Sequence, residues 1–161
     1  MSKIKDLIND EINILVFDVD GVLSTLEWGA HNHYAMNDDA WNIACAEGMN
    51  AYNEERVIKK MQDFLRKRNN KKIYVITTIG HNNEGEFKKD FVNKYYNIPR
   101  ENVYYVKDNM EKKEKLKEIR KLYPELEDYR IIMVDDTVDI LNDIMENTNY
   151  STVHISSFLD I

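Results

Sequence analysis

The sequence contains only one cysteine, Cys45, so it cannot form an intramolecular disulfide. This composition fits a reducing compartment such as the cytoplasm, and Cys45 is expected to be a small packing residue. Long apolar runs are missing as well, which argues against a membrane span, and the polar start of the chain does not resemble a secretory leader. The chain also lacks an excess of basic residues. Its formal net charge of -7 argues against nucleic acid or an anionic membrane as a partner.

Apolar residues make up 43% of the 161-residue sequence, enough to bury one substantial core. No internal repeat, low-complexity tract or linker interrupts the chain, so residues 1–161 are predicted to form a single domain. Strand-type and helix-type patterns alternate along it. This alternation predicts an α/β fold, a Rossmann-like parallel sheet of about five strands with helices on both faces.

The predicted strands are short apolar or β-branched runs at residues 12–17, 72–76, 103–106, 130–134 and 151–155. The predicted helices cover residues 3–9, 38–48, 53–69, 109–123 and 137–147, together with a helix that ends before Pro99. We expect Asn83 to cap this last helix, with Glu86 completing a capping box. Residues 22–50 should form a flap and a small helical insert, which is too short for a separate cap domain.

Two carboxylates, Asp18 and Asp20, stand where the first apolar strand ends. Their spacing is costly, because each charge must be desolvated beside the other. A shared divalent cation would remove that cost, leaving Asp18 free to attack as a nucleophile and Asp20 to handle a proton. Gly21 permits the sharp turn that follows. Asp and Gly also favour ordinary turns, so the motif alone does not exclude a turn without catalytic function.

Other strands of the predicted sheet also end in polar residues. Thr77 and Thr78 follow the second strand, whereas Asp135 and Asp136 follow the fourth. Ligands of open parallel sheets bind beyond the carboxyl ends of the strands, where these residues would converge. Threonine at a strand end and aspartate at a helix start are each common. Their convergence with Asp18 and Asp20 is what predicts a site.

A lysine completes the predicted site, and Lys112 is the preferred candidate. It lies on the apolar stripe that Leu116 and Ile119 define on the predicted helix. A lysine on the buried side of a helix is costly unless it meets an anion, such as a phosphoryl oxygen or Asp18. The alternatives are a frayed first turn that leaves the amine in water, and Lys107 as the functional lysine.

In order and spacing, these residues resemble the haloacid dehalogenase superfamily of aspartate-nucleophile phosphohydrolases. The resemblance extends over about residues 12–157. Three motifs of the superfamily match at residues 16–23, 75–78 and 132–139. Val134 departs from the pattern, because many members have glycine there. It is therefore open whether Asp135 or Asp136 binds the metal directly; we favour Asp135, with Asp136 or Asp139 acting through water.

The resemblance implies a Mg²⁺-dependent phosphomonoester hydrolase that forms an aspartyl-phosphate and acts on a small phosphorylated metabolite. Asp18 would be the nucleophile and Asp20 the general acid and base. The phosphate would be bound by Thr77, Thr78 and Lys112. The metal ligands would be Asp18, Asp20, Asp135 and Asp136.

Two other functions share these features: a receiver-like domain that accepts phosphate on aspartate, and a catalytically idle phosphate-binding domain. Residues 34–43 also loosely resemble a segment of the 3-deoxy-octulosonate-8-phosphate phosphatases, which complete their sites by forming homo-oligomers. That resemblance allows for a homo-oligomer here. Four side chains of the predicted flap are expected either to stack on a substrate sugar or base or to pack within the protein: Trp28, His31, His33 and Tyr34.

Overall fold

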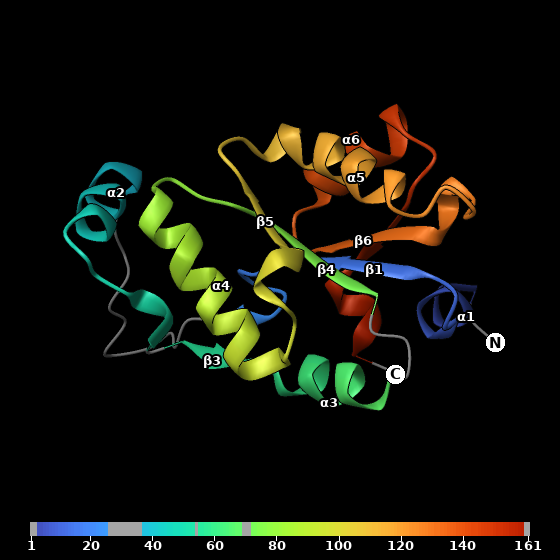
Figure 1. The fold of residues 1–161 in the computed structure, drawn as a ribbon, viewed down its shortest axis with the longest axis horizontal. Helices are drawn as coiled ribbons and strands as arrows, with labels where there is room; N and C mark the ends of the chain where they lie inside the picture. The colour runs from blue at the N-terminus through green and yellow to red at the C-terminus, as the bar shows by residue number, and fades with distance from the viewer. Residues whose placement is uncertain (1–2, 26–36, 54, 69–71, 160–161) are drawn as a thin grey trace.

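The computed structural model describes residues 3–25, 37–53, 55–68 and 72–159. A five-stranded parallel sheet with the strand order β5-β4-β1-β6-β7 forms its centre (Figure 1). The strands are β1 (Ile14–Phe17), β4 (Ile73–Thr78), β5 (Val103–Val106), β6 (Ile131–Asp135) and β7 (Ser151–His154). A short antiparallel pair, β2 (Ser24–Thr25) and β3 (Arg56–Val57), lies apart from this sheet.

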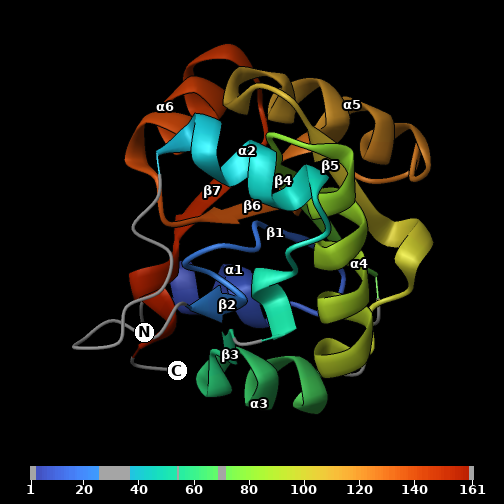
Figure 2. The same ribbon diagram turned by 90° about the vertical axis from the view of Figure 1, so that its left-hand side faces the viewer.

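Helices cover both faces of the sheet (Figure 1). One face carries α1 (Lys3–Asn9), α3 (Lys59–Lys67) and α4 (Asn82–Tyr96), and the other carries α5 (Lys112–Lys121) and α6 (Val138–Asn147). Figure 2 shows α2 (Asp38–Ala46) on the side of the molecule toward which the strands run. Short 3₁₀ turns are η1 (Ala51–Asn53), η2 (Arg100–Asn102), η3 (Asn109–Glu111), η4 (Asp128–Arg130) and η5 (Ile155–Phe158).

The two-residue period of a strand divides the core into two layers. Leu15 and Phe17 of β1 pack into the layer beneath α1, α3 and α4, whereas Ile14 and Val16 pack beneath α5 and α6. All four side chains are fully buried. Burying a side chain of this size stabilises a fold by about 1.5–3 kcal/mol, so both layers hold β1 in place.

The predicted α/β class, the five parallel strands and the absence of a large cap are confirmed in the described residues. The single helix predicted over residues 53–69 is wrong, because this segment contains the end of η1, then β3 and α3. The predicted capping box is also wrong. His81 caps α4 by accepting a hydrogen bond from the Asn83 backbone, while Glu86 pairs with Arg100 instead.

The strand order explains why acidic residues from distant parts of the chain meet. From β1, the chain first builds outward through β4 and β5, and then returns to add β6 and β7 on the other side. Such a switch point opens a crevice at the carboxyl ends of the strands. Phe17 pairs in register with Val134, so Asp18 and Asp135 leave the sheet side by side.

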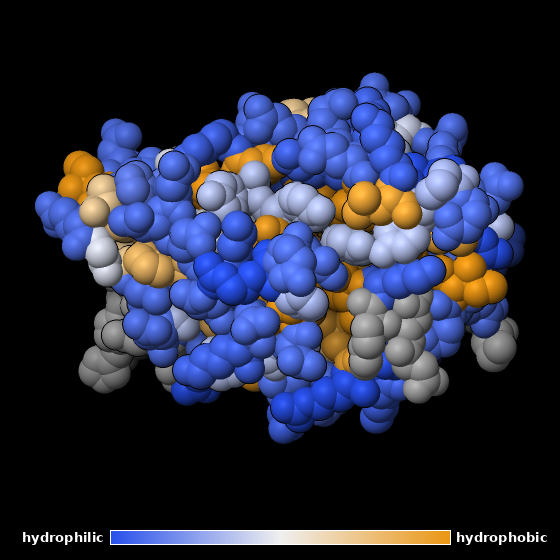
Figure 3. Space-filling view, in the orientation of Figure 1, coloured by the Kyte–Doolittle hydropathy of each residue, from blue (hydrophilic) through white to orange (hydrophobic). Residues whose placement is uncertain are grey.

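Hydrophobic residues are scattered among hydrophilic ones over the face of the molecule shown in Figure 3. In the described part of the chain, no helix combines the length and hydrophobicity that a membrane span requires.

Candidate active site

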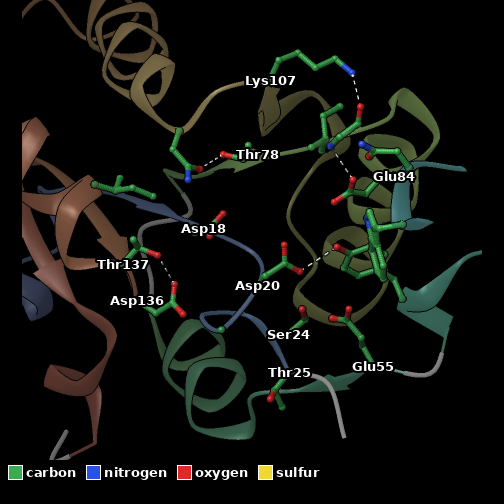
Figure 4. A pocket seen from close by; sticks show the side chains of 18 residues that line it. Asp18, Asp20, Ser24, Thr25, Glu55, Thr78, Glu84, Lys107, Asp136 and Thr137 are labelled. Atoms are coloured by element: carbon green, nitrogen blue, oxygen red, sulfur yellow. Dashed lines mark hydrogen bonds between the residues drawn. The ribbon is translucent and has the colours of Figure 1, made fainter. Parts of the chain in front are cut away.

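A cavity of about 830 Å³ opens where the sheet strands end (Figure 4). The segments after β1, β4, β5 and β6 each contribute to its wall, and α2 and η1 cover part of it. The residues that line it are Asp18, Asp20, Gly21, Ser24, Thr25, Trp41, Asn42, Tyr52, Glu55, Thr78, Ile79, Gly80, Glu84, Lys107, Asn109, Asp136, Thr137 and Ile140.

Asp18 is a buried carboxylate at the base of this cavity. Its Oδ1 atom has no hydrogen-bond partner within the described chain, although Lys112 Nζ lies 3.3 Å away. Burial raises the pKa of the Asp18 carboxyl to about 6, and the positive charge of Lys112 opposes this shift. Asp18 therefore combines a largely desolvated oxygen with access to the cavity, as a nucleophile requires.

Lys112 is 1% exposed, on the buried side of its helix as the apolar stripe predicted, and it bridges two acidic residues. Its Nζ donates a hydrogen bond to Asp135 Oδ2 at 2.8 Å, in addition to its contact with Asp18. The other oxygen of Asp135 accepts a hydrogen bond from the Thr137 backbone at 2.9 Å. Both carboxylate oxygens of Asp135 are thus already bonded to protein donors.

Asp18, Asp135 and Asp136 each offer a carboxylate oxygen, and these oxygens lie within 4.8 Å of one another. Lys112 is the ammonium in contact with this group, so three negative charges meet one positive charge. A divalent cation would neutralise the remaining two charges, and carboxylate oxygens are ligands that Mg²⁺ prefers. The residues therefore fit a divalent metal ion. The side chain of Asp20, predicted as a fourth ligand, lies outside this group.

Gly21 allows the chain to pass close to Asp136. Its φ angle of +72° lies in the left-handed region, which other residues rarely adopt. A Cβ atom at this position would also stand 2.3 Å from Asp136 Oδ2. The glycine after Asp20 therefore serves the site twice, because it turns the chain and leaves room for the carboxylate of Asp136, which follows β6.

Asp20 faces the same cavity, but its carboxylate contacts Tyr52 and Lys88 rather than Lys112. Tyr52 donates a hydrogen bond to Asp20 Oδ1 at 3.0 Å, and Lys88 Nζ lies 2.7 Å from Asp20 Oδ2. The Asp20 side chain is 52% exposed, so it remains open to solvent and to a bound ligand. Asp20 is thus fixed in orientation yet accessible, which suits proton transfer.

Lys88 is a functional candidate that the sequence reasoning missed. Its side chain is 1% exposed and also contacts Glu84 at 2.8 Å and Thr77 Oγ1 at 3.2 Å. Burial acts to lower the pKa of Lys88, but the carboxylates of Asp20 and Glu84 outweigh it and raise the pKa. The burial of Lys88 could have been predicted from the spacing of apolar residues in the sequence. Lys88 precedes Phe91 and Val92 by three and four residues, which places it on the buried face of α4.

The two predicted phosphate-binding threonines differ in position. Thr77 is 1% exposed and accepts its hydrogen bond from Lys88, away from the cavity lining. Thr78 does line the cavity, and its hydroxyl is hydrogen-bonded to Asn109 (Figure 4). Lys107, the rival lysine, stands at another part of the wall and donates a hydrogen bond to the Gly80 carbonyl at 3.3 Å. The flap residues Trp28, His31, His33 and Tyr34 lie outside the described residues.

A solved structure with a similar backbone agrees with this fold. No curated protein matches the chain. DsGPDH of Dunaliella salina is similar in structure, with a TM-score of 0.58 and 16% identity; the match covers 94% of this chain and 25% of that one. The chain thus spans about a quarter of the length of that protein. An inactive mutant of the HAD domain of the Legionella pneumophila effector Lem4 gives a TM-score of 0.49 and 13% identity, covering 88% of this chain and 84% of that one.

The sequence itself matches a family profile over residues 13–160, which is nearly the whole chain. The profile is that of the NLI interacting factor-like phosphatases, and it spans the aspartates at the ends of β1 and β6, the threonines of β4 and Lys112. The chain therefore belongs to the NLI interacting factor-like phosphatase family, within the haloacid dehalogenase superfamily.

Proposed function

We propose that the protein is a Mg²⁺-dependent phosphomonoester hydrolase that acts on a small phosphorylated metabolite through an aspartyl-phosphate on Asp18. One observation carries this proposal. A buried, largely unbonded carboxylate oxygen faces the same cavity as Asp20, which two side chains hold in a fixed orientation. This is the division into nucleophile and acid–base group that phosphoryl transfer through an enzyme carboxylate needs.

Asp18 and Asp136 are the proposed direct ligands of the metal ion. Asp136 lines the cavity, whereas Asp135 is fully buried and bonded through both oxygens. This geometry favours Asp136 over the Asp135 preferred from the sequence, and gives Asp135 the task of orienting Lys112. When bound, Mg²⁺ would screen the repulsion between the Asp18 carboxylate and a phosphoryl dianion.

In the proposed reaction, Asp18 attacks phosphorus in line with the ester oxygen, which leaves as the P–O bond breaks. Asp20 donates a proton to that oxygen and later removes one from the water that hydrolyses the aspartyl-phosphate. We expect Lys112 and the hydroxyl of Thr78 to bind phosphoryl oxygens, since Lys112 contacts Asp18 and Thr78 lines the cavity. Positioning and electrostatics of this kind supply most of the catalysis in phosphoryl transfer.

Turnover of p-nitrophenyl phosphate with Mg²⁺, with EDTA, and in the Asp18→Asn variant tests this proposal. We expect multiple turnovers only for the wild type with metal, because the isosteric amide keeps the fold but cannot attack. Rapid acid quenching with a radiolabelled ester should trap phosphate on the wild-type protein and not on Asp18→Asn. Substantial activity in Asp18→Asn would refute the nucleophile assignment.

The two alternative functions give different results in the same assay. A receiver-like domain would take up phosphate once from a reactive donor and release it slowly, and the family match argues against it. An idle phosphate-binding member would bind phosphate without releasing p-nitrophenol under any metal condition.

A further inference from the structure

Glu55 is a buried carboxylate in the wall of the cavity that the proposed reaction does not use. It follows η1, directly precedes β3, and is 9% exposed. Its Oε2 atom has no hydrogen-bond partner among the described residues, and neither does Oγ of Ser24, which is 1% exposed. Both residues line the cavity. The Ser24 hydroxyl is a close neighbour of Glu55 and acts to lower its pKa, but no hydrogen bond of regular geometry reaches Oε2. A buried carboxylate oxygen in this state is costly unless a ligand bonds to it.

The other carboxylates of the cavity wall differ from Glu55 because each has an identified partner. Asp20 is held by Tyr52 and Lys88. Glu84 pairs with Lys88 and also accepts a hydrogen bond from the Gly80 backbone at 2.9 Å. In the proposed metal site, Asp136 accepts a hydrogen bond from Thr137, and Asp18 Oδ1, which is also without a hydrogen-bond partner, belongs to the proposed nucleophile. Glu55 is therefore a buried acceptor of this wall that is open on one oxygen and has no task in the proposed reaction.

The position of Glu55 relates it to the leaving group rather than to the phosphate. In Figure 4, Ser24 and Glu55 lie on the side of Asp20 that is turned away from Asp18. Asp18 marks where phosphorus would be attacked, and Asp20 marks where the ester oxygen would leave. A substrate that spans these two points extends its leaving group toward Ser24 and Glu55.

We propose that Glu55 binds a hydrogen-bond donor, a hydroxyl or an ammonium, on the leaving group of the substrate. This inference rests on the proposed phosphatase function and narrows its substrate class to phosphomonoesters of polyols, sugars or amino alcohols. The same carboxylate disfavours leaving groups that bear a second anionic group. Ser24 contributes a hydroxyl beside it.

The charge of the cavity wall agrees with a preference for leaving groups without a second anionic group. Lys107 is the cation in the described lining, and its Nζ donates a hydrogen bond to the Gly80 carbonyl. An anionic leaving group beside Glu55 would therefore meet a like charge at this wall. Burial raises the pKa of Glu55 to about 7; the neighbouring Ser24 hydroxyl opposes this shift, and the charge of Asp20 adds to it. Near neutral pH, the carboxyl can thus either accept from or donate to a hydroxyl.

A matched set of six-carbon esters tests the proposal: n-hexyl phosphate, sorbitol 6-phosphate, 6-aminohexyl phosphate and 6-phosphogluconate. For the wild type with Mg²⁺, kcat/KM for sorbitol 6-phosphate should exceed that for n-hexyl phosphate by roughly 10–100-fold, the size expected for a hydrogen bond to a charged group. In Glu55→Leu this ratio should fall close to one. The ratio is taken within each variant, so a general loss of activity does not affect it.

Glu55→Gln separates the two donors and serves as a second variant if Glu55→Leu does not fold. The amide can still bond to a hydroxyl, so the preference for sorbitol 6-phosphate should largely remain, whereas any preference for 6-aminohexyl phosphate should disappear with the charge. The discrimination between sorbitol 6-phosphate and 6-phosphogluconate should shrink, because the repelling carboxylate is gone. Glu101→Gln, an exposed change of the same charge, is the control and should alter none of these ratios.

Two failures can be told apart. If the wild type hydrolyses the esters but their ratios are the same in wild type and Glu55→Leu, the inference about Glu55 is overturned and the proposed function stands. If no ester is hydrolysed, the proposed function fails, and calorimetric titration of the same four esters then decides the inference. Equal binding of sorbitol 6-phosphate and n-hexyl phosphate in that titration would overturn it.

Discussion

Asp20 and Asp18 are two residues apart, yet their surroundings differ in the way that their proposed roles require. Asp18 is buried against Lys112, whereas Asp20 is half exposed and held by Tyr52 and Lys88. We expect Asp20→Asn to slow turnover of alkyl phosphates by roughly 10²–10⁴-fold, the usual size of general acid–base catalysis. The loss should be smaller with p-nitrophenyl phosphate, whose leaving group needs little protonation. Equal losses for both esters would point to a purely structural role for Asp20.

Lys112 is the residue whose removal should most affect the proposed nucleophile. Lys112→Met leaves Asp18 and Asp135 buried without their shared cation, a change that costs about 3–5 kcal/mol for a buried pair. We expect loss of turnover and a lowered melting temperature in EDTA, partly restored by Mg²⁺. Lys115→Met is the matched control, because Lys115 forms an exposed pair with Glu118 that contributes less than about 1 kcal/mol. Normal turnover in Lys112→Met, with a loss in Lys107→Met, would move the role to Lys107.

Lys88 acts on the reaction through Asp20, so it is proposed as a positioning residue. Lys88→Met should lower kcat more than it changes KM, and more for alkyl phosphates than for p-nitrophenyl phosphate, as in Asp20→Asn. Lys89→Met is the control, because Lys89 is partly exposed and pairs with Glu86. The double variant of Lys88 and Asp20 should lose little more than Asp20→Asn alone. Additive losses would show that Lys88 affects turnover independently of Asp20.

At the scale of elements, the close approach of α4 to β5 places Glu84 at the cavity and Lys88 against Asp20. Gly85 permits this approach, because a Cβ atom there would lie 2.7 Å from the ring of Tyr105. Helix propensity alone predicts that Gly85→Ala stabilises α4 by about 1 kcal/mol. The packing predicts the opposite, a loss of about 1–3 kcal/mol from overpacking. Urea unfolding decides between them, and Tyr105→Leu should partly rescue Gly85→Ala if the contact is the cause.

For the whole molecule, Glu55 should make stability depend on pH. Burial raises its pKa to about 7 from an ordinary value of 4.5, so the folded protein holds this proton more tightly than the unfolded chain. The resulting stability is fully present below pH 4.5 and is lost as the pH rises to about 7, by up to roughly 3 kcal/mol. Glu55→Gln should gain stability relative to the wild type over this interval. A difference between the two proteins that does not vary with pH would contradict the assignment.

The family and the fold follow from local patterns in the sequence. Alternating strand and helix periods predicted the parallel sheet, because side chains repeat every two residues in a strand and about every 3.6 residues in a helix. The carboxyl ends of parallel strands share one edge, so the aspartates at the ends of β1 and β6 were expected to meet; Asp18, Asp135 and Asp136 do, whereas the Asp20 side chain lies outside their group. The stripe of α5 placed Lys112 on the buried side for the same periodic reason.

Tertiary structure alone decided which atoms face the cavity. Asp135 and Asp136 are neighbours in sequence, but one is bonded through both oxygens within the protein and the other borders the cavity. Thr77 and Thr78 differ in the same manner, because Thr77 is buried within the protein and Thr78 borders the cavity. Three further side chains of the site come from segments that lie 32 to 68 residues after Asp20 in the sequence: Tyr52, Glu55 and Lys88. Local periodicity specifies which face of an element is buried, but these contacts depend on how distant elements pack, which only the folded chain determines.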